Sequence, residues 1–244
     1  MRNDLYAEMA FLEESHWWFV GRRAIIQQVL KCFLPHRVPK ALDIGCGTGK
    51  NFELINKFAV HVSGTDASPL ALEVARRKYP RIHFSLGDSV PQDKHQTYDL
   101  ITLFDVLEHI EDDADALRRL YAFLKPRGIA VITVPALLFL WSRHDEFFGH
   151  YRRYTRVTLQ NVVSHQTHFR IEKMTYFNFF LFPAVFGVRL VRKLLGIKRG
   201  RSDFFPLPQQ LNALLSGVLR FEAVLLGSFN FPIGVSMICV LRKP

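Results

Sequence analysis

Three glycines at alternate positions mark the segment of this chain best suited to holding a small ligand. Gly45, Gly47 and Gly49 directly follow the apolar run 41–44 and precede a helical pattern. Glycines at a strand–helix turn let the backbone bend sharply and approach a ligand that any Cβ would obstruct. A dinucleotide fingerprint wants a further glycine three positions after the second, where this chain has Lys50. The motif therefore disfavours a nicotinamide cofactor.

Two acidic residues follow the next two apolar runs. Asp66 stands roughly 20 residues after the glycines, where a carboxylate can accept hydrogen bonds from both ribose hydroxyls. Asp88 can accept a hydrogen bond from an adenine amino group. S-adenosylmethionine (SAM) presents an uncharged adenosine and a sulfonium, so its site needs no phosphate-cradling lysine. Singly, either carboxylate can instead cap the following helix, but together with the glycines they favour SAM.

The elements that must position these residues follow an alternating pattern. Strands are expected at 41–44, 60–65, 82–86, 98–104, 128–134, 170–176 and 234–241, and helices at 17–34, 51–58, 69–78 and 113–124, with a further helix opened by Thr155. This alternation predicts an α/β fold with a doubly wound, mostly parallel, seven-stranded Rossmann-like sheet. An N-terminal helix precedes the sheet, and a helical insertion precedes its last strand.

Five strings carry a resemblance to a known family. LDIGCGTG, GTDAS, GDSV, FDVLEHI and LKPRGIAVITVP resemble, in order and spacing, the motifs of class I SAM-dependent methyltransferases over residues 41–136. Two more strings, HWWFVGRR and WSRHDEFFGHYRRYT, resemble bacterial methyltransferases associated with polysaccharide or glycolipid synthesis.

The resemblance implies SAM as cofactor and a role for each matching residue. Asp43, Gly45 and Gly47 would line the methionine end, Asp66 would hold the ribose, Asp88 would meet the adenine, and Phe104 would lie beside the sulfonium. The full set of predicted cofactor-binding residues is Asp43, Gly45, Cys46, Gly47, Gly49, Asp66, Ala67, Asp88, Ser89 and Phe104.

Methyl transfer from a sulfonium is an in-line displacement, so catalysis consists mainly of positioning in a water-poor site. A hydroxyl acceptor also needs its proton removed. His109, Asp105 and His150 are the candidate catalytic residues, although His109 can also simply cap or pack at the start of a helix. Asp105, Glu108 and His109 have i, i+3, i+4 spacing, as in methyltransferases that bind a divalent metal. Those usually have Glu at the position of Asp105, and we expect no metal.

The densest polar and aromatic cluster lies in the stretch 141–156. His144, Tyr151, Arg152 and Arg153 are predicted to bind the acceptor, because the arginine fork suits phosphate. An internally salt-bridged loop is the alternative. Trp17 and Trp18, with His16, Arg22 and Arg23, are predicted to form a lid beside this cluster, although the Trp pair can equally pack in the core.

Composition indicates the charge of a partner and the compartment in which the protein works. The 244 residues carry 32 Lys+Arg against 22 Asp+Glu, a formal charge of +10, which favours an anionic partner. Three scattered cysteines suggest neither a disulfide framework nor a zinc site, and the first residues lack a secretion signal. We therefore expect a cytoplasmic protein, at the inner face of the membrane if it meets one.

The whole chain is expected to form one methyltransferase domain. Its parts are an N-terminal helical lid (1–39), a SAM-binding core (40–136), an acceptor-side segment (137–177), the helical insertion (178–231) and the last strand (232–244).

The insertion combines large apolar side chains with cations. Its first half is rich in Phe, Val and Leu, and its cations are Arg189, Arg192, Lys193, Lys198, Arg199 and Arg201. The pattern favours an interfacial helix on anionic lipid and a lipid-linked acceptor. A cap or a dimer interface is the alternative. The second half, 207–226, is apolar at helical spacing and can pack against the first.

Other functions fit less well. Base-methylating enzymes of similar fold carry an Asn/Asp-Pro-Pro-Tyr/Phe string after the fourth strand, where this chain has Phe104-Asp105-Val106-Leu107. Nucleic acid is thus an unlikely partner, and we expect a small-molecule or lipid-linked anionic acceptor. A non-catalytic SAM-binding scaffold and a nicotinamide oxidoreductase are the remaining alternatives.

Overall fold

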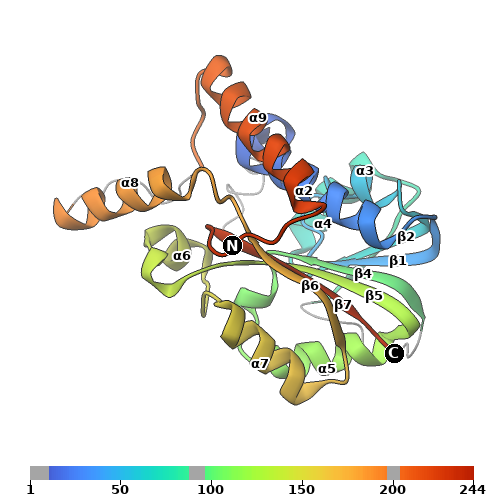
Figure 1. The fold of residues 1–244 in the computed structure, drawn as a ribbon. Coiled ribbons are helices and arrows are strands. Elements are labelled where there is room, and N and C mark those ends of the chain that lie inside the picture. Colours follow the sequence, from blue (N-terminus) through green and yellow to red (C-terminus); the bar gives the residue numbers. More distant parts are fainter. Residues whose placement is uncertain (1–10, 88–96, 197–203) are drawn as a thin grey trace.

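The computed structural model describes residues 11–87, 97–196 and 204–244. In these residues, seven strands form one sheet in the order β3-β2-β1-β4-β5-β7-β6. The described neighbours pair in parallel except β7, which is antiparallel to both β5 and β6. Helices cover both faces of the sheet (Figure 1). The predicted fold class is confirmed.

Each predicted strand overlaps an observed one. The strands are β1 (Val38–Ile44), β2 (Ala59–Asp66), β3 (His83–Leu86), β4 (Tyr98–Phe104), β5 (Leu124–Pro135), β6 (Arg170–Phe177) and β7 (Ser236–Arg242). The central strands are buried on both faces, as β-branched and leucine-rich runs in a parallel sheet require. The chain order reverses between β1 and β4, and at such a switch point parallel sheets bind their ligands.

The helices begin and end at recognisable signals. They are α2 (Trp17–Phe33), α3 (Phe52–Ile55), α4 (Pro69–Lys78), α5 (Asp113–Phe123), α6 (Arg143–Phe148), α7 (Arg156–Gln166), α8 (Phe182–Leu194) and α9 (Gln209–Leu226), with short 3₁₀ turns at Leu107–His109 and Leu138–Leu140. The Ser68 hydroxyl caps α4 through the amide of Ala71, with Pro69 in the first turn. The helix expected at 51–58 ends early at Ile55. Tight i→i+3 hydrogen bonds there, such as Phe58 N–H to the Ile55 carbonyl, turn the chain directly into β2.

One core lies on each face of the sheet. Leu117 and Leu120 of α5 pack with Leu159 of α7 on one side. On the other side α2 and α9 lie together, and Gly21 permits their close approach because a Cβ there would lie 2.4 Å from Leu219 Cδ1. Helix α2 is thus braced by α9.

The segment between β6 and β7 contains two diverging helices (Figure 1). The two halves meet where the segment begins: the N–H groups of Phe179 and Phe180 donate to Glu222 Oε2 of α9 at 2.9 and 3.3 Å. Beyond this contact, α9 buries Leu219, Ala223 and Leu226 against the sheet and α2. None of the residues of α8 is buried. No helix in the described ranges is both long and apolar enough to cross a bilayer.

Candidate functional site

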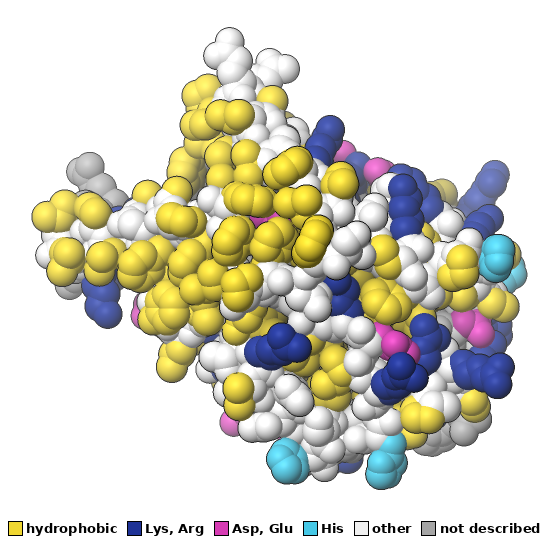
Figure 2. Space-filling view, viewed as in Figure 1, with side chains coloured by type: hydrophobic (Ala, Val, Ile, Leu, Met, Phe, Trp, Pro, Cys, Tyr) yellow, Lys and Arg dark blue, Asp and Glu magenta, His cyan; other side chains and the backbone are white. Residues whose placement is uncertain are grey.

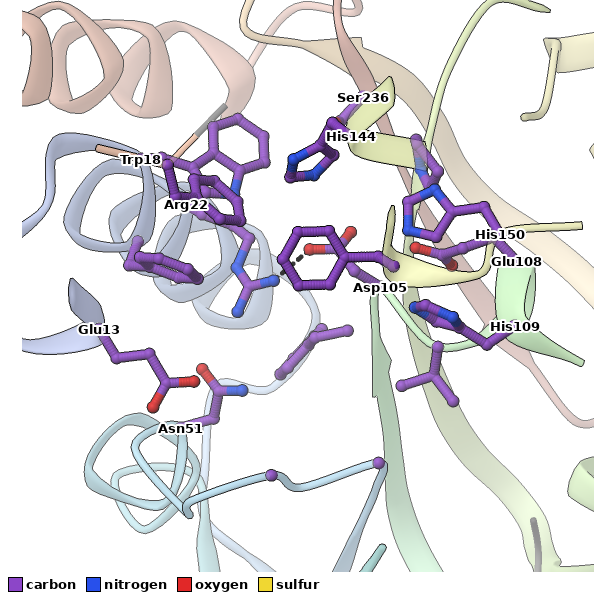
Figure 3. Close-up of a pocket in the computed structure, with 18 of the residues that line it drawn as sticks. Glu13, Trp18, Arg22, Asn51, Asp105, Glu108, His109, His144, His150 and Ser236 are labelled. Atoms are coloured by element: carbon purple, nitrogen blue, oxygen red, sulfur yellow. Dashed lines mark hydrogen bonds and ion pairs between the residues drawn. The ribbon is translucent and has the colours of Figure 1, made fainter. Parts of the chain in front are cut away.

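A cavity of about 510 Å³ opens where β1, β2 and β4 end, between α2, α6 and the start of α8. Figure 3 shows its two ends. Asn51 marks the glycine end, which also includes the loop 45–48, whereas His144 and His150 mark the histidine end. The ion pair between Arg22 and Asp105 lies between them. A ligand at each end would bring two reactants together near Asp105.

The glycine end is shaped by backbone that only glycine adopts easily. Gly45, Gly47 and Gly49 have φ values of 67°, 55° and 88°, in the left-handed region where a Cβ is strained. A Cβ on Gly45 would lie 2.3 Å from Val106 Cγ2, so packing against protein also requires that glycine. A Cβ on Gly47 would meet no atom within 4 Å, because the space beside it belongs to the cavity. This open cradle suits a ligand pressed against the backbone.

Asp66 lies at the end of β2 and lines the same end of the cavity. Its Oδ2 accepts the Gly47 N–H at 2.8 Å, and its Oδ1 accepts the Ser68 N–H at 2.8 Å. A carboxylate has about four acceptor positions, so both oxygens can still accept from a diol. The amides fix the orientation of the carboxylate and tie it to the glycine loop. Ala67 lines the cavity next to it.

Some of the remaining predicted cofactor residues line the cavity and others do not. Cys46 and Phe104 line the cavity, and Asp43 and Gly49 lie outside its lining. Asp43 is buried and its Oδ1 accepts the Thr102 hydroxyl at 2.6 Å, while Oδ2 has no partner in the described structure. Burial raises the pKa of Asp43 to about 7. This buried, partnerless oxygen behind the loop is consistent with a polar ligand nearby.

Two predictions lie outside the described residues. Asp88 and Ser89, the expected adenine contacts, fall in the range 88–96. Their part in binding the cofactor remains a prediction. Gly87, just before them, lines the cavity.

Asp105 is held in an unusual conformation at the centre of the cavity. Its φ of 58° is left-handed, and such strain concentrates at functional sites. Arg22 forms an ion pair with its Oδ2, and the Thr133 hydroxyl donates to its Oδ1 at 3.0 Å. Both carboxylate oxygens are therefore engaged, and an acceptor proton would compete with Arg22 for Asp105.

Two histidines and a buried carboxyl group form the histidine end. The rings of His109 and His150 meet edge to face, with centroids 4.7 Å apart. His109 is accessible from the cavity, yet the surrounding protein and His150 lower its pKa to about 4. Glu108 is fully buried and neither carboxyl oxygen has a partner among the described residues. Burial and the charge of Asp105 raise its pKa well above the usual value, so a neutral carboxyl group is favoured.

The metal-ligand triplet considered from the sequence is not the one that the fold assembles. Residues 107–109 form a 3₁₀ turn, and Asp105 turns its carboxylate to Arg22. Instead Glu108, His109 and His150 offer one ligand atom each within 4.8 Å of one another, a set in the described structure that could hold a metal ion. The expectation of no metal remains a prediction.

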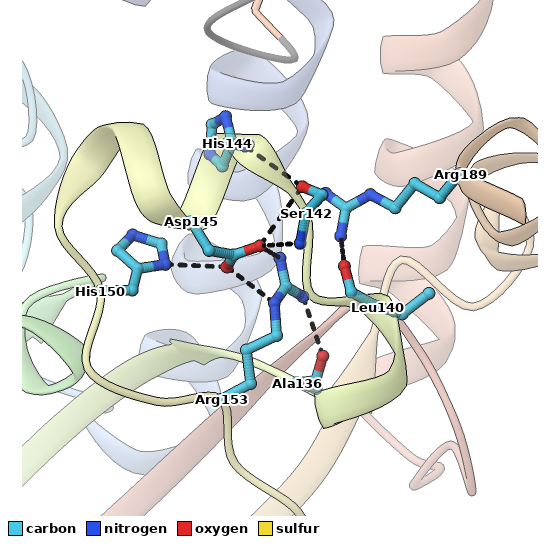
Figure 4. Close-up of polar contacts among 8 residues, drawn as sticks. All are labelled: Ala136, Leu140, Ser142, His144, Asp145, His150, Arg153 and Arg189. Carbon is cyan, nitrogen blue, oxygen red and sulfur yellow. Dashed lines mark hydrogen bonds and ion pairs between the residues drawn. The ribbon is translucent and has the colours of Figure 1, made fainter. Parts of the chain in front are cut away.

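Asp145 organises the wall behind His150 (Figure 4). His150 Nδ1 lies 2.9 Å from Asp145 Oδ1, and the same carboxylate receives Arg153 Nε at 2.7 Å and Nη2 at 3.1 Å. The backbone N–H of Ser142 donates to it at 2.8 Å. Burial alone would raise the pKa of Asp145, but the bonds from His150 and Arg153 outweigh it and hold the pKa well below its ordinary value. Asp145 is thus a permanent anion that orients His150.

The two arginines expected to bind the acceptor have other partners. Arg153 reaches the cavity wall, but it holds Asp145 and donates to the Ala136 carbonyl at 2.9 Å. Arg152 lies outside the lining, 2.9 Å from Asp113 Oδ2, and donates to a backbone carbonyl at 2.6 Å. Tyr151 is exposed and also outside the lining. These contacts correspond to the alternative of an internally salt-bridged segment.

Aromatic rings close the cavity from the α2 side. Trp17 and Trp18 are half-buried in the lining, and Trp18 stacks on Phe177 with centroids 5.8 Å apart. Phe204, which precedes α9, reaches the same wall and contacts His144 with a centroid distance of 4.9 Å. Trp18 therefore both packs against the core and faces the site.

Sequence reasoning missed several lining residues. Asn178, Arg189 and Phe204 all line the cavity. Arg22, which the sequence grouped with the tryptophans of the lid, lines it as well and lies one helical turn after Trp18 on the same face of α2. Asn178 and Arg189 offered no such signal, because only the chain reversal after β6 brings them to the cavity.

Comparison with known proteins agrees with this arrangement. Residues 17–173 match the family described as a methyltransferase domain. A trans-aconitate 2-methyltransferase of Methylobacterium radiotolerans is 37% identical over 42% of this chain and 40% of its own length. A mitochondrial ubiquinone biosynthesis O-methyltransferase of Schizosaccharomyces pombe is 36% identical over 38% of this chain and 37% of its own. The chain thus spans about two fifths of these curated relatives.

A solved structure gives the likeness of the fold. A phosphoethanolamine N-methyltransferase 2 of Haemonchus contortus, in complex with SAM, superposes with a TM-score of 0.58 at 18% identity, over 90% of this chain and 52% of that one. The family match covers well over half of the chain, and the glycine cradle with Asp66 fits SAM. The chain therefore belongs to the methyltransferase-domain family.

Proposed function

We propose that this protein transfers a methyl group from SAM to a hydroxyl oxygen of a small-molecule or lipid-linked acceptor that bears a sugar or a phosphate. SAM, when bound, supplies an electrophilic methyl group on a sulfonium. The glycine loop and Asp66 are the residues that would hold it. The curated relatives are named for acceptors such as trans-aconitate, and this supports a small-molecule acceptor rather than a macromolecule.

The observation that carries the proposal is the pairing of His150 with Asp145. A hydroxyl is a poor nucleophile until its proton is removed. Because Asp145 is a buried anion 2.9 Å from His150 Nδ1, it favours the tautomer with the proton on Nδ1. Nε2 is then left as the acceptor of a proton. His150 lines the cavity and is our candidate general base.

The neighbours of His150 favour the same assignment. His109, with a pKa of about 4, is uncharged at neutral pH and does not repel a proton arriving on His150. Asp105 is engaged by Arg22 and Thr133, which makes it a positioning residue. Arg189 brings a guanidinium to the wall of the histidine end, and a guanidinium suits a phosphate or carboxylate on the acceptor.

Labelled SAM tests the proposal directly. Purified protein is incubated with methyl-labelled SAM and a total lipid extract, a water-soluble metabolite extract or total RNA, and the labelled product is identified by mass spectrometry. We expect label in a lipid-linked or small anionic product that has gained one methylene unit on oxygen. Label confined to RNA, or to a nitrogen or carbon atom, would contradict the proposal.

Variants separate catalysis from cofactor binding. His150→Gln should lower the turnover by about 10²–10⁴-fold, the usual contribution of a general base, with S-adenosylhomocysteine (SAH) affinity unchanged. His109→Gln is the matched control on the neighbouring ring, and we expect it to retain most activity. Equal losses in both variants would show that the histidine pair, rather than His150, accepts the proton.

A further inference from the structure

We infer that the outward faces of α8 and α9 form a docking surface for an anionic lipid bilayer. On α8 this surface comprises Val188, Val191, Leu194 and Leu195, and on α9 it comprises Leu214 and Val224. Figure 2 shows hydrophobic side chains running along both helices and over the junction between them. We call this the α8–α9 face. The inference concerns membrane contact and does not depend on which atom is methylated.

The exposure of α8 is the first argument. Leu194 and Leu195 expose 75% and 69% of their surface, and α8 as a whole contains no buried residue. Val188, Val191 and Leu195 recur at i, i+3 and i+7, so they share one side of the helix. An extended apolar helix face open to solvent marks an interaction site.

The two helices are fixed to the body by their other sides. Phe186 of α8 meets Phe139 with ring centroids 5.8 Å apart, and Arg189 donates to the Leu140 carbonyl. On α9, the side carrying Leu219 and Leu226 is buried, whereas Val224 is 67% exposed. The exposed apolar side chains therefore lie on the outward side of both helices, and the contacts with the body fix the orientation of that side.

The charges on the two helices favour an anionic partner. Within Phe182–Leu194 and Gln209–Leu226 the cations are Arg189, Arg192, Lys193 and Arg220, and the single acid, Glu222, is buried. An apolar face accompanied by cations and no exposed acid is the pattern of a helix lying at an anionic membrane surface. The cations Lys198, Arg199 and Arg201, also noted in the sequence, lie outside the described residues.

The surface is continuous with the site. Val185 and Arg189 of α8 line the histidine end of the cavity, while Val188, Val191 and Leu194 of the same helix belong to the α8–α9 face. A headgroup in the cavity could thus belong to a lipid whose chains remain in the bilayer. This continuity favours a membrane over a soluble protein partner, because a lipid-linked acceptor must reach the histidine end of the cavity from the bilayer surface.

Vesicle flotation tests the inference with the full chain. Wild-type protein should float with phosphatidylcholine vesicles that contain phosphatidylglycerol, more weakly with pure phosphatidylcholine, and less as salt is raised. Leu194→Ser/Leu195→Ser should lose flotation on both kinds of vesicle. Val60→Ser/Val157→Ser, which alters two exposed apolar residues on other elements, should float like the wild type.

A charge-reversal pair tests the electrostatic part. Arg192→Glu/Lys193→Glu should weaken binding to anionic vesicles by at least about tenfold, since each cation near the surface contributes about 1 kcal/mol. Arg77→Glu/Arg170→Glu changes the net charge equally on other elements, at side chains 78% and 76% exposed, and should bind far better. Circular dichroism melts confirm that all variants fold.

Three outcomes would overturn the inference. Wild-type protein could stay soluble with anionic vesicles at low salt. The control variants could lose binding as fully as the α8 variants. Light scattering could also show a dimer that Leu194→Ser/Leu195→Ser dissociates, without any vesicle binding, which would make the face an interface between two copies.

Discussion

Removal of the Asp66 carboxylate should weaken cofactor binding while leaving the fold intact. Asp66 is half-buried at the end of β2, and each of its oxygens already accepts one backbone N–H at 2.8 Å. We expect the ribose diol of the cofactor to donate to the same carboxylate. Hydrogen bonds to a charged group contribute about 1.5–3 kcal/mol each, so Asp66→Ala should lower SAH affinity by at least about tenfold. Asp66→Asn keeps one acceptor oxygen and should lose less.

The assay is titration calorimetry with SAH, which needs no knowledge of the acceptor. Asp99→Ala is the control, because Asp99 also caps a backbone N–H, that of Lys40 at 2.9 Å, but lies outside the cavity lining. It should bind SAH like the wild type. Unchanged affinity in a folded Asp66→Ala protein would refute the ribose assignment. An equal loss in the Asp99 variant would show a general effect on the sheet.

Four further predictions concern the residues of the site. Gly47→Val should abolish SAH binding in calorimetry, because its side chain would enter the cavity from a left-handed backbone; retained binding would show that the ligand lies elsewhere. Arg153→Ala should destabilise the fold by about 3–5 kcal/mol in urea, since it leaves Asp145 buried without its cation, whereas Arg152→Ala, which removes a partly exposed ion pair, should cost under about 1 kcal/mol. Glu108→Gln should raise the melting temperature at pH 8 and have little effect near pH 4. Burial and Asp105 raise the folded-state pKa of Glu108, so the folded chain keeps a proton that the unfolded chain releases. Wild-type stability therefore falls by up to about 1.4 kcal/mol per pH unit between the unfolded-state and the folded-state pKa. EDTA should leave wild-type melting and turnover unchanged, and a loss restored by magnesium would instead make Glu108 a metal ligand.

Local chemistry made the cofactor half of the site predictable. The left-handed turn at Gly45 and Gly47 can be recognised from residue type, because few other residues tolerate it. Asp66 follows from its place at the end of a β-branched run. The α/β class with a mostly parallel sheet likewise follows from the alternating periodicity. These features depend on neighbours in the chain.

The acceptor half depends on contacts between distant segments. From the sequence, Arg153 looks like a phosphate ligand, but folding brings it to Asp145 and gives it a structural partner. His150 could be named a base, yet only the packing of α6 shows which carboxylate orients it. Glu108 and His150 are 42 residues apart in the printed sequence and become neighbours at the cavity.

The amino-acid sequence by itself determined the fold class and the glycine end of the cavity, because periodicity and glycine spacing are local properties of a chain. The tertiary structure alone decided which cations are engaged, that α9 braces α2 rather than α8, and that Arg189 and Phe204 reach the site. The physical reason is that ion pairing and burial are set by distances in space. Those distances exist only once the sheet and its two helical layers have packed.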